Sequence, residues 1–308
     1  MDEFDFVDHY GEAEETAQSN QLPDNEVECA LNCAFVGVGG GGGKLAKAFL
    51  DLGFKKTLLI NTTEKDQPDG VDEEHLVLIP DADGVAKNIE YGKDVFTRNG
   101  AVVEDALRTK LGNVDWLFVL AGGGGGTGSA CFALDPVFQR YLNSVNGEGK
   151  VFYIMTWPSS QELLNTTITN NAVSLANDIK SAPHIVLDNE KQIKFLRGRV
   201  GMMNLFPTAN TAFAKLLSQT FKLASEKSSI QSFDSKDLER CLSTDGRIFL
   251  GTTVIRDPSD PNLGSLIYQN CLQKSPCPGP KGNIQTGVLL LVVTDQLASD
   301  PSLSNQLE

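Results

Sequence analysis

Short apolar runs alternate with helix-like segments along the first two-thirds of the chain. Runs rich in Val, Ile, Leu and Phe, which are typical of buried strands, occupy residues 29–38, 56–61, 75–80, 114–121, 150–157 and 184–189. Segments with the apolar spacing of helices lie between them, over residues 44–53, 101–111, 129–145 and 167–181. This alternation predicts an α/β fold, in which a Rossmann-like parallel sheet is covered by helices on both faces.

The pattern changes after residue 206. One long helix is predicted over residues 207–227, with a proline at its start. A helix, a strand, a second helix and a second strand are then expected over residues 233–243, 246–257, 260–275 and 286–295. We therefore expect an N-terminal extension, a first domain, a central helix and a smaller α+β domain, with bounds 1–28, 29–206, 207–227 and 228–308.

Composition indicates a soluble cytoplasmic protein without a membrane partner. Hydrophobic residues make up 41% of the chain, and no apolar run approaches the roughly 20 residues that span a bilayer. Residues 1–28 carry ten Asp and Glu and no Lys or Arg, which predicts a disordered acidic extension rather than a secretory signal. No segment is basic enough to predict direct contact with nucleic acid, so DNA would be reached through an adaptor.

The six cysteines lie mostly in or beside apolar segments. This placement favours free thiols in a reducing cytosol. A zinc site would require Cys29 and Cys33 to converge with Cys271 and Cys277, and neither spacing is usual for zinc. We therefore assign no metal ligand from the sequence.

Two runs of five glycines, 39–43 and 122–126, each follow a predicted strand and precede a predicted helix. Such a turn presents unpaired backbone N–H groups at the positive end of a helix dipole, which suits phosphate. The turns follow the first and fourth strands, so they can lie side by side at the carboxyl edge of one sheet, where open α/β sheets bind ligands. A purely structural role in a tight turn could explain one such run, but it explains two runs of five glycines poorly.

Simple phosphate-binding motifs fit poorly. A P-loop fails twice, because Val38 stands where its first glycine belongs and Leu45 where its hydroxyl belongs. A dinucleotide fingerprint fits Gly37, Gly39 and Gly42 formally, but Asn61 replaces the acid expected for the ribose. That fingerprint also does not predict the second turn, and a dehydrogenase is kept as a distant alternative.

The segment "GGGTGS" (124–129) resembles the signature loop of the tubulin/FtsZ superfamily. Further motifs of that superfamily follow in the same order: "FVGVGGGGGKLAKAF", "LLINTTEKD", "TWPSSQE", "HIVLDNEK", "FPTANTAFAKLL" and "QSFDSKDLERCL". The resemblance covers about residues 30–295 and is most similar to the plasmid- and phage-borne TubZ type. Three positions depart from the usual pattern: Lys44, Trp157 and Ser232. The third loop, around residues 81–100, lacks the usual glycine-alanine pattern.

The resemblance implies a GTPase that binds GTP and GDP with Mg²⁺. The backbone of the two glycine turns would hold the phosphates, Glu162 would contact the ribose, and Asn189 and Asn210 would contact guanine. The implied nucleotide-binding residues are Gly39, Gly40, Gly41, Gly42, Gly43, Lys44, Asn61, Gly124, Gly125, Gly126, Thr127, Gly128, Ser129, Glu162, Asn189 and Asn210. The implied catalytic residues are Asp234 and Asp237, although an N-cap role for Asp234 is the ordinary alternative.

The central helix would separate these two acids from the glycine turns by roughly 30 Å. The resemblance resolves this by head-to-tail stacking, in which the acids of one subunit act on the nucleotide of the next and form a filament. Hydrolysis would then depend on assembly, and positioning of plasmid or phage DNA is the implied role. An FtsZ-like role in division or membrane shaping, and a GTP-binding regulator that does not polymerise, are the alternatives. Further elements usually follow residue 295 in this family, so we expect an incomplete second domain.

Overall fold

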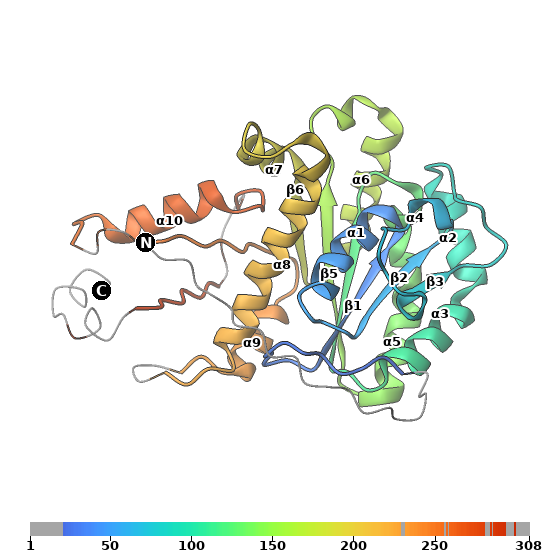
Figure 1. Cartoon of the computed structure of the whole chain (residues 1–308), viewed down its shortest axis with the longest axis horizontal. Helices are drawn as coiled ribbons and strands as arrows, with labels where there is room; N and C mark the ends of the chain where they lie inside the picture. The colour runs from blue at the N-terminus through green and yellow to red at the C-terminus, as the bar shows by residue number, and fades with distance from the viewer. Residues whose placement is uncertain are drawn as a thin grey trace.

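The computed structural model describes residues 21–228, 232–255, 257, 259–280, 284, 286–293 and 299. Within them lies one seven-stranded sheet with the order β3-β2-β1-β4-β5-β6-β7, and all its pairings are parallel. The strands are β1 (Cys33–Val38), β2 (Thr57–Asn61), β3 (Leu76–Leu78), β4 (Trp116–Gly122), β5 (Lys150–Trp157), β6 (His184–Asp188) and β7 (Arg247–Ile248) (Figure 1). The predicted α/β fold with a parallel sheet is confirmed.

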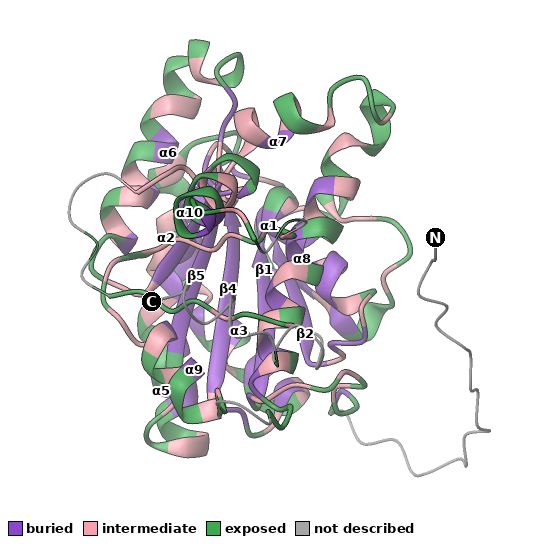
Figure 2. Cartoon of the chain, turned by 90° about the vertical axis from the view of Figure 1, so that its left-hand side faces the viewer, coloured by how far each residue is buried: buried purple, intermediate pink, exposed green. Residues whose placement is uncertain are grey.

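Helices cover both faces of the sheet, and the buried strands lie between them (Figure 2). The described α-helices are α1 (Gly39–Leu50), α2 (Ile89–Arg98), α3 (Gly100–Ala106), α4 (Gly126–Ser129), α5 (Asp135–Asn146), α6 (Thr166–Ile179), α7 (Asn189–Leu196), α8 (Leu205–Leu223), α9 (Ser235–Leu242) and α10 (Leu263–Lys274), of which α10 projects away from the sheet (Figure 1). One hydrophobic core joins the sheet to α2, α3, α5 and α6. A second core joins the opposite face to α1, α8 and α9. Because successive strand residues point to opposite faces, each central strand contributes to both cores.

A group of phenylalanines fixes α8 against the sheet. The ring of Phe35 in β1 stacks on Phe49 of α1 at 4.1 Å between ring centroids. On the same face, Phe118 of β4 lies 5.4 Å from Phe221 of α8. Each such ring buries a large apolar surface, and paired rings add about 0.5–1.5 kcal/mol beyond it. The helix predicted over 207–227 is therefore confirmed as α8, with its bounds shifted toward the N-terminus.

The structure corrects several expected bounds. The first predicted helix begins at Gly39 rather than at residue 44, because the first glycine run itself forms the opening turns of α1. The first strand begins at Cys33 rather than at residue 29. The helix expected over 129–145 is divided into α4, a 3₁₀ turn and α5. Two helices, α2 and α7, were not expected.

The region after α8 differs more from expectation. The strand expected over 246–257 is reduced to β7, which pairs with β6 and so extends the main sheet. Residues 286–293 form no strand, and the remainder of that predicted strand, 294–295, lies outside the described residues. Helices α9 and α10 confirm the two helices expected here. The division into domains remains a prediction.

The last residues of the predicted N-terminal extension contact the folded body. The backbone N–H of Leu22 donates to the carbonyl of Lys110 at 2.8 Å, and the Leu22 side chain is buried. The amide of Asn25 donates to the carbonyl of Cys33 at 3.0 Å. Residues 1–20, on which the prediction of disorder also rested, lie outside the described residues. None of the described helices has the length and apolarity that a membrane crossing requires.

Candidate functional site

The two glycine turns lie side by side, as predicted. Strands β1 and β4 are adjacent, with Val38 opposite Ala121 at their carboxyl ends. A Cβ atom at Gly39 would lie 2.8 Å from the backbone nitrogen of Gly128, and one at Gly41 would lie 3.3 Å from the Cα of Gly122. The two backbones therefore approach too closely for side chains between them.

Part of the glycine content is required by packing alone. A Cβ atom at Gly42 would lie 2.1 Å from the carbonyl oxygen of Leu120, so α1 could not approach β4 with any other residue there. Gly128 is similar, since its Cβ atom would lie 2.7 Å from the carbonyl oxygen of Gly122. Gly125 is different. It is exposed, and a Cβ atom there would meet nothing within 4 Å. The space in front of Gly125 is therefore open to a ligand.

Both glycine turns also carry backbone donors. The first N–H groups of α1, from Gly39 to Gly41, have no partner within their own helix because a helix begins with unpaired donors. The turn at α4 adds the N–H groups of Gly126 and Thr127 in the same way. Both helices place the positive end of their dipole here. The arrangement suits an anion with several oxygens, such as a di- or triphosphate.

Two threonine hydroxyls join the second strand to the second glycine turn. The Oγ1 atoms of Thr62 and Thr127 lie 2.9 Å apart. Asn61 is buried, and its Oδ1 accepts a hydrogen bond from the backbone N–H of Thr62 at 2.8 Å. Asn61 therefore fixes the backbone that carries Thr62. Sequence analysis missed Thr62, although its place directly after β2 was a usable signal.

The third loop is held against the second glycine turn by Asn171 of α6. Its Nδ2 donates to the carbonyl of Lys87 at 2.9 Å and to that of Gly124 at 3.3 Å. The loop backbone is strained here, because Ala86 and Lys87 have φ angles of 47° and 63°. A Cβ atom at Gly126 would lie 2.9 Å from the Cα of Lys87. Asn171 was not predicted, because nothing in the pattern of α6 separates it from an ordinary helical asparagine.

The remaining predicted nucleotide contacts follow the same edge of the sheet. Since β1, β4, β5 and β6 are consecutive and parallel, their carboxyl ends form one row. Glu162 follows β5, and its Oε2 accepts hydrogen bonds from the N–H and hydroxyl of Ser159, both at 2.8 Å. Asn189 is the first residue of α7, directly after β6, and Asn210 is half-buried on α8, which α7 contacts.

The loop after β5 is tied to α7 through a carboxylate. Oε2 of Glu190 accepts a hydrogen bond from the backbone N–H of Ser160 at 3.1 Å. This bond, together with the neighbouring Lys194, lowers the pKa of Glu190. The contact brings together the segments that carry Glu162 and Asn189.

Three further predicted residues differ in their surroundings. Lys44 is exposed on α1. Ser129 is buried, and its hydroxyl lies 3.5 Å from the carbonyl of Gly122. A Cβ atom at Gly43 would lie in ordinary contact with Leu59, at 3.6 Å, so this glycine is not required by crowding.

One carboxylate beside the first turn was missed. A Cβ atom at Gly40 would lie 3.2 Å from the Cβ of Asp66. Magnesium usually takes one or two carboxylates, keeps several waters and relies on substrate phosphates. No group of three or more His, Cys, Asp or Glu residues suited to a metal ion occurs within the described ranges. A single carboxylate beside a phosphate cradle therefore fits Mg²⁺ that arrives with a nucleotide, and Asp66 is the residue that would assist it.

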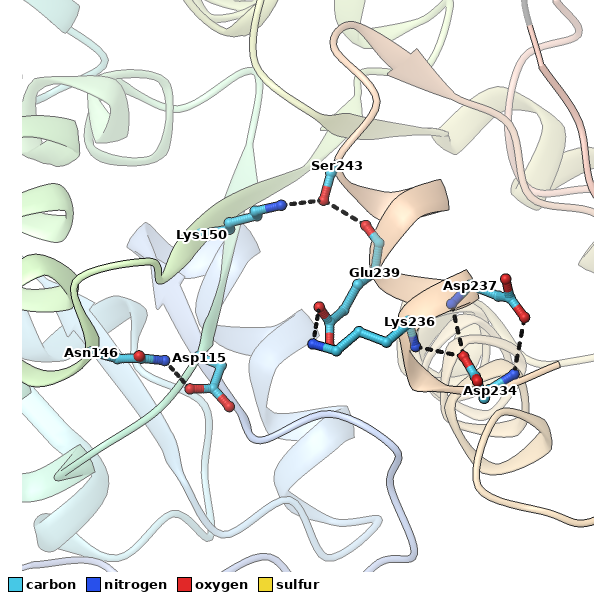
Figure 3. Close-up of polar contacts among 8 residues, drawn as sticks. All are labelled: Asp115, Asn146, Lys150, Asp234, Lys236, Asp237, Glu239 and Ser243. Atoms are coloured by element: carbon cyan, nitrogen blue, oxygen red, sulfur yellow. Dashed lines mark hydrogen bonds and ion pairs between the residues drawn. The ribbon is translucent and has the colours of Figure 1, made fainter.

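The two predicted catalytic acids cap helix α9. Oδ1 of Asp234 accepts hydrogen bonds from the N–H groups of Lys236 and Asp237, at 2.8 and 3.1 Å. Oδ2 of Asp237 accepts one from the N–H of Asp234 at 3.3 Å (Figure 3). This reciprocal pair is a capping box. The N-cap interpretation of Asp234 is therefore confirmed, and each carboxylate keeps one oxygen outside the box.

The structure does not bring these acids to the glycine turns. Helix α9 lies at the amino edge of the sheet, where the Nζ of Lys150, the first residue of β5, donates to the hydroxyl of Ser243 at 2.6 Å (Figure 3). The glycine turns lie at the carboxyl edge. Seven residues of β4 separate the two edges, which is about 20 Å. Within one chain the acids and the cradle are therefore too far apart to act on one ligand.

No protein-family model matches the sequence, and no curated protein matches it. Solved structures do match. The chain is similar to C-terminally truncated TubZ of Clostridium botulinum phage c-st, with a TM-score of 0.61 and 19% identity over 82% of this chain and 77% of that one. It is similar to TubZ of Bacillus thuringiensis serovar israelensis in a GTPγS-form protofilament, with a TM-score of 0.66 and 19% identity over 79% and 70% of the two chains.

The GTPγS-bound protofilament of CetZ2 from Haloferax volcanii also matches, with a TM-score of 0.63 and 22% identity over 80% of this chain and 75% of that one. TubZ and CetZ are members of the tubulin/FtsZ superfamily. The resemblance that the glycine-rich motifs indicated is therefore confirmed at the level of the fold.

Proposed function

We propose that this chain is a GTP-binding and GTP-hydrolysing cytoskeletal protein that assembles head to tail into filaments. The observation that carries the proposal is the pair of adjoining glycine turns, which hold the first backbone donors of two helices and leave the space in front of Gly125 open. TubZ of Bacillus thuringiensis and CetZ2 of Haloferax volcanii are similar structures solved as protofilaments in GTPγS form, and this TubZ also has a GDP form. Their nucleotide and their assembly support the same ligand and the same behaviour here.

The position of each residue suggests its role in nucleotide binding. Backbone amides at 39–41 and 126–127 would hold the phosphates, and Glu162, Asn189 and Asn210 lie along the edge where the sugar and base would extend. Mg²⁺ would neutralise charge on the phosphate oxygens, with Asp66 nearby. The residues fit this ion because Asp66 offers one hard oxygen ligand, and the phosphates that the backbone amides would hold would offer others.

Asp234 and Asp237 would complete the site of an adjoining subunit. Because they lie at the edge opposite the cradle, translation of one copy along the strand direction brings one edge toward the other. There a carboxylate can orient the attacking water. Hydrolysis would therefore require assembly. The DNA-positioning role, an adaptor and a cytoplasmic location belong to this proposal through the TubZ resemblance.

A GTP-binding regulator that does not polymerise is the second candidate. It is favoured by the capping box, since both acids already have a structural role in the single chain. Sedimentation with GTP, with GDP and without nucleotide, together with phosphate release, separates the two. We expect pelleting and phosphate release with GTP alone. Tight GTP binding without pelleting would instead support the regulator, and no GTP binding would reject both.

A further inference from the structure

Two cysteines lie in contact at the amino edge of the sheet. The Sγ atoms of Cys29 and Cys33 are 3.9 Å apart, and both residues are free thiols. Cys33 is the first residue of β1, and Cys29 lies in the segment directly before it. All six cysteines of the chain belong to the described residues, and no other two of them come within hydrogen-bonding distance there. The pair is therefore a distinct feature among the thiols of this protein.

The chain bends at residues 30–31, and hydrogen bonds fix this bend on both sides. On one side, the backbone N–H of Ala30 donates to the carbonyl of Phe221 in α8 at 3.4 Å. On the other side, the carbonyl of Asn32 accepts from the backbone N–H of Asp115, directly before β4, at 2.9 Å. Because the bend is tied to two separate elements, the packing of α8 and the sheet holds the two thiols together before any bond joins them.

The two thiols differ in their access to solvent and in their acidity. Cys33 is fully buried, whereas Cys29 is half-buried. The hydrogen bond from Cys33, helped by the backbone N–H of Leu31, lowers the pKa of Cys29. The same hydrogen bond, together with burial, raises the pKa of Cys33. Since the thiolate is the reactive form, Cys29 is the thiol that meets a reagent from solvent, and Cys33 lies behind it.

The other four cysteines do not share this arrangement. Burial raises the pKa of each of them: Cys131, Cys241, Cys271 and Cys277. Cys241 and Cys271 are half-buried, as Cys29 is, but neither has a thiol beside it. Partial exposure alone therefore does not distinguish Cys29, and the neighbouring thiol does. No group of three or more ligands within the described ranges suits a metal ion, so the pair is not part of a zinc site there.

We propose that Cys29 and Cys33 form a site of reversible oxidation by hydroperoxides, which join the two residues in a disulfide. In the first step the Cys29 thiolate attacks the terminal peroxide oxygen. An S–O bond forms, the O–O bond breaks, and the leaving alkoxide or hydroxide takes up a proton. Cys29 is then a sulfenic acid, oxidised by two electrons, and the peroxide has been reduced to an alcohol or to water.

In the second step the sulfur of Cys33 attacks the sulfur of Cys29. The S–S bond forms, the S–O bond breaks, and the proton of the Cys33 thiol leaves with the hydroxide as water. The sulfurs of a disulfide are about 2.05 Å apart, so the less tightly packed Cys29 side chain has to turn toward its partner. A dithiol reductant reverses the bond by exchange and is itself oxidised to a disulfide.

This site is independent of the proposed function. Cys33 begins β1, and the first glycine turn follows the other end of the same strand. The disulfide can therefore form whether or not the chain binds GTP or assembles.

The test treats the full chain with an equimolar amount of hydrogen peroxide. Thiols that remain are then alkylated in denaturant and located by mass spectrometry. We expect Cys29 and Cys33 to be lost together within one chain while the other four thiols remain, and dithiothreitol to restore both. Cys29→Ser should slow the loss of thiols at least tenfold. Cys33→Ala should stop at a sulfenic acid on Cys29, which dimedone traps. Cys241→Ser is the matched control and should form the disulfide as the original chain does.

Three results would overturn the proposal. The first is oxidation of Cys241 or Cys271 ahead of the pair in the unaltered chain. The second is loss of thiols from Cys29→Ser at the original rate. The third is a disulfide that joins two chains rather than two residues of one chain. Urea unfolding shows that each variant is folded, and if Cys33→Ala is not, the unaltered chain and Cys29→Ser still decide the matter.

Discussion

Glycines in the two turns have distinct physical roles, and the atoms around each glycine separate those roles. At Gly42 the carbonyl of Leu120 occupies the place of a side chain, so the residue is fixed by the packing of α1 on β4. At Gly125 no atom occupies that place, so packing does not explain the glycine. The nucleotide proposed above would explain it, if it lies in front of this backbone. Each residue lies within a run of five glycines, so the sequence alone does not distinguish their roles.

The matched pair Gly125→Ala and Gly42→Ala tests this distinction. Gly125 has a φ of −83°, which alanine adopts without strain, so Gly125→Ala should change unfolding free energy by less than about 0.5 kcal/mol. Its methyl group should nevertheless weaken GTP binding at least tenfold. Gly42→Ala should cost about 1–3 kcal/mol or more through overpacking. Urea unfolding and titration with fluorescent GTP measure both. Unchanged GTP affinity in folded Gly125→Ala would remove that space from the site.

Asn171 provides a second residue-level test. Replacing it with leucine should leave the carbonyls of Lys87 and Gly124 without their donor, at a cost of about 1–3 kcal/mol. Hydrogen exchange should also accelerate across residues 81–88. Asn170→Leu is the control, because Asn170 is the exposed neighbour on the same helix. Equal effects of the two substitutions would show that the bridge does not hold the third loop.

At the scale of elements, α9 combines a structural cap with the candidate acids. Its first turn is closed by the capping box between Asp234 and Asp237. Its C-terminal end is held to β5 by the hydrogen bond between Lys150 and Ser243. Removing a carboxylate therefore also loosens the helix end. A loss of hydrolysis in an alanine variant could come from either cause.

Asp234→Asn separates these causes. Asparagine caps a helix about as well as aspartate, whereas alanine costs about 1 kcal/mol. We expect Asp234→Asn to keep stability and assembly yet to lower phosphate release per assembled subunit at least tenfold. Asp234→Ala should lose both hydrolysis and about 1 kcal/mol of stability. Release at the original rate from assembled Asp234→Asn would assign the residue to capping alone.

The elements that sequence predicted best are those with one dominant signal. Continuous apolar runs identified β1, β4 and β5, because buried parallel strands need such runs on both faces. The start of α1 was misplaced because glycine disfavours helices, and here close packing on Leu120 overrides that preference. The apolar run at 246–257 overstated β7, of which two residues, Arg247 and Ile248, pair with the first two residues of β6.

The candidate site also has parts that the sequence predicted and parts that it did not. The glycine turns and the individual motifs were predicted, because each is a short, local stretch of sequence. Contacts such as Asn171 with Lys87, or Thr62 with Thr127, join residues more than sixty positions apart. They depend on how α6 and β2 pack, which no local pattern records. The N-cap role of Asp234 was foreseen as the alternative, because an N-cap signature is local.

At the scale of the whole molecule, the sheet separates the two glycine turns, where we propose that phosphate binds, from the acids proposed to act there. About 20 Å of parallel strand lies between the two edges, and no side chain spans that length. The cradle and the acids can therefore cooperate only if the edges of two copies meet. Under the proposed function, hydrolysis is a property of the assembly, and a single copy would bind nucleotide without cleaving it.

The dependence of turnover on protein concentration tests this most directly. Phosphate release per molecule should be near zero below the concentration at which the chain pellets with GTP, and should rise steeply above it. GTP binding should be the same on both sides of that threshold. If release per molecule is constant across the threshold, cleavage occurs within one chain, and the separation of cradle and acids between copies is wrong.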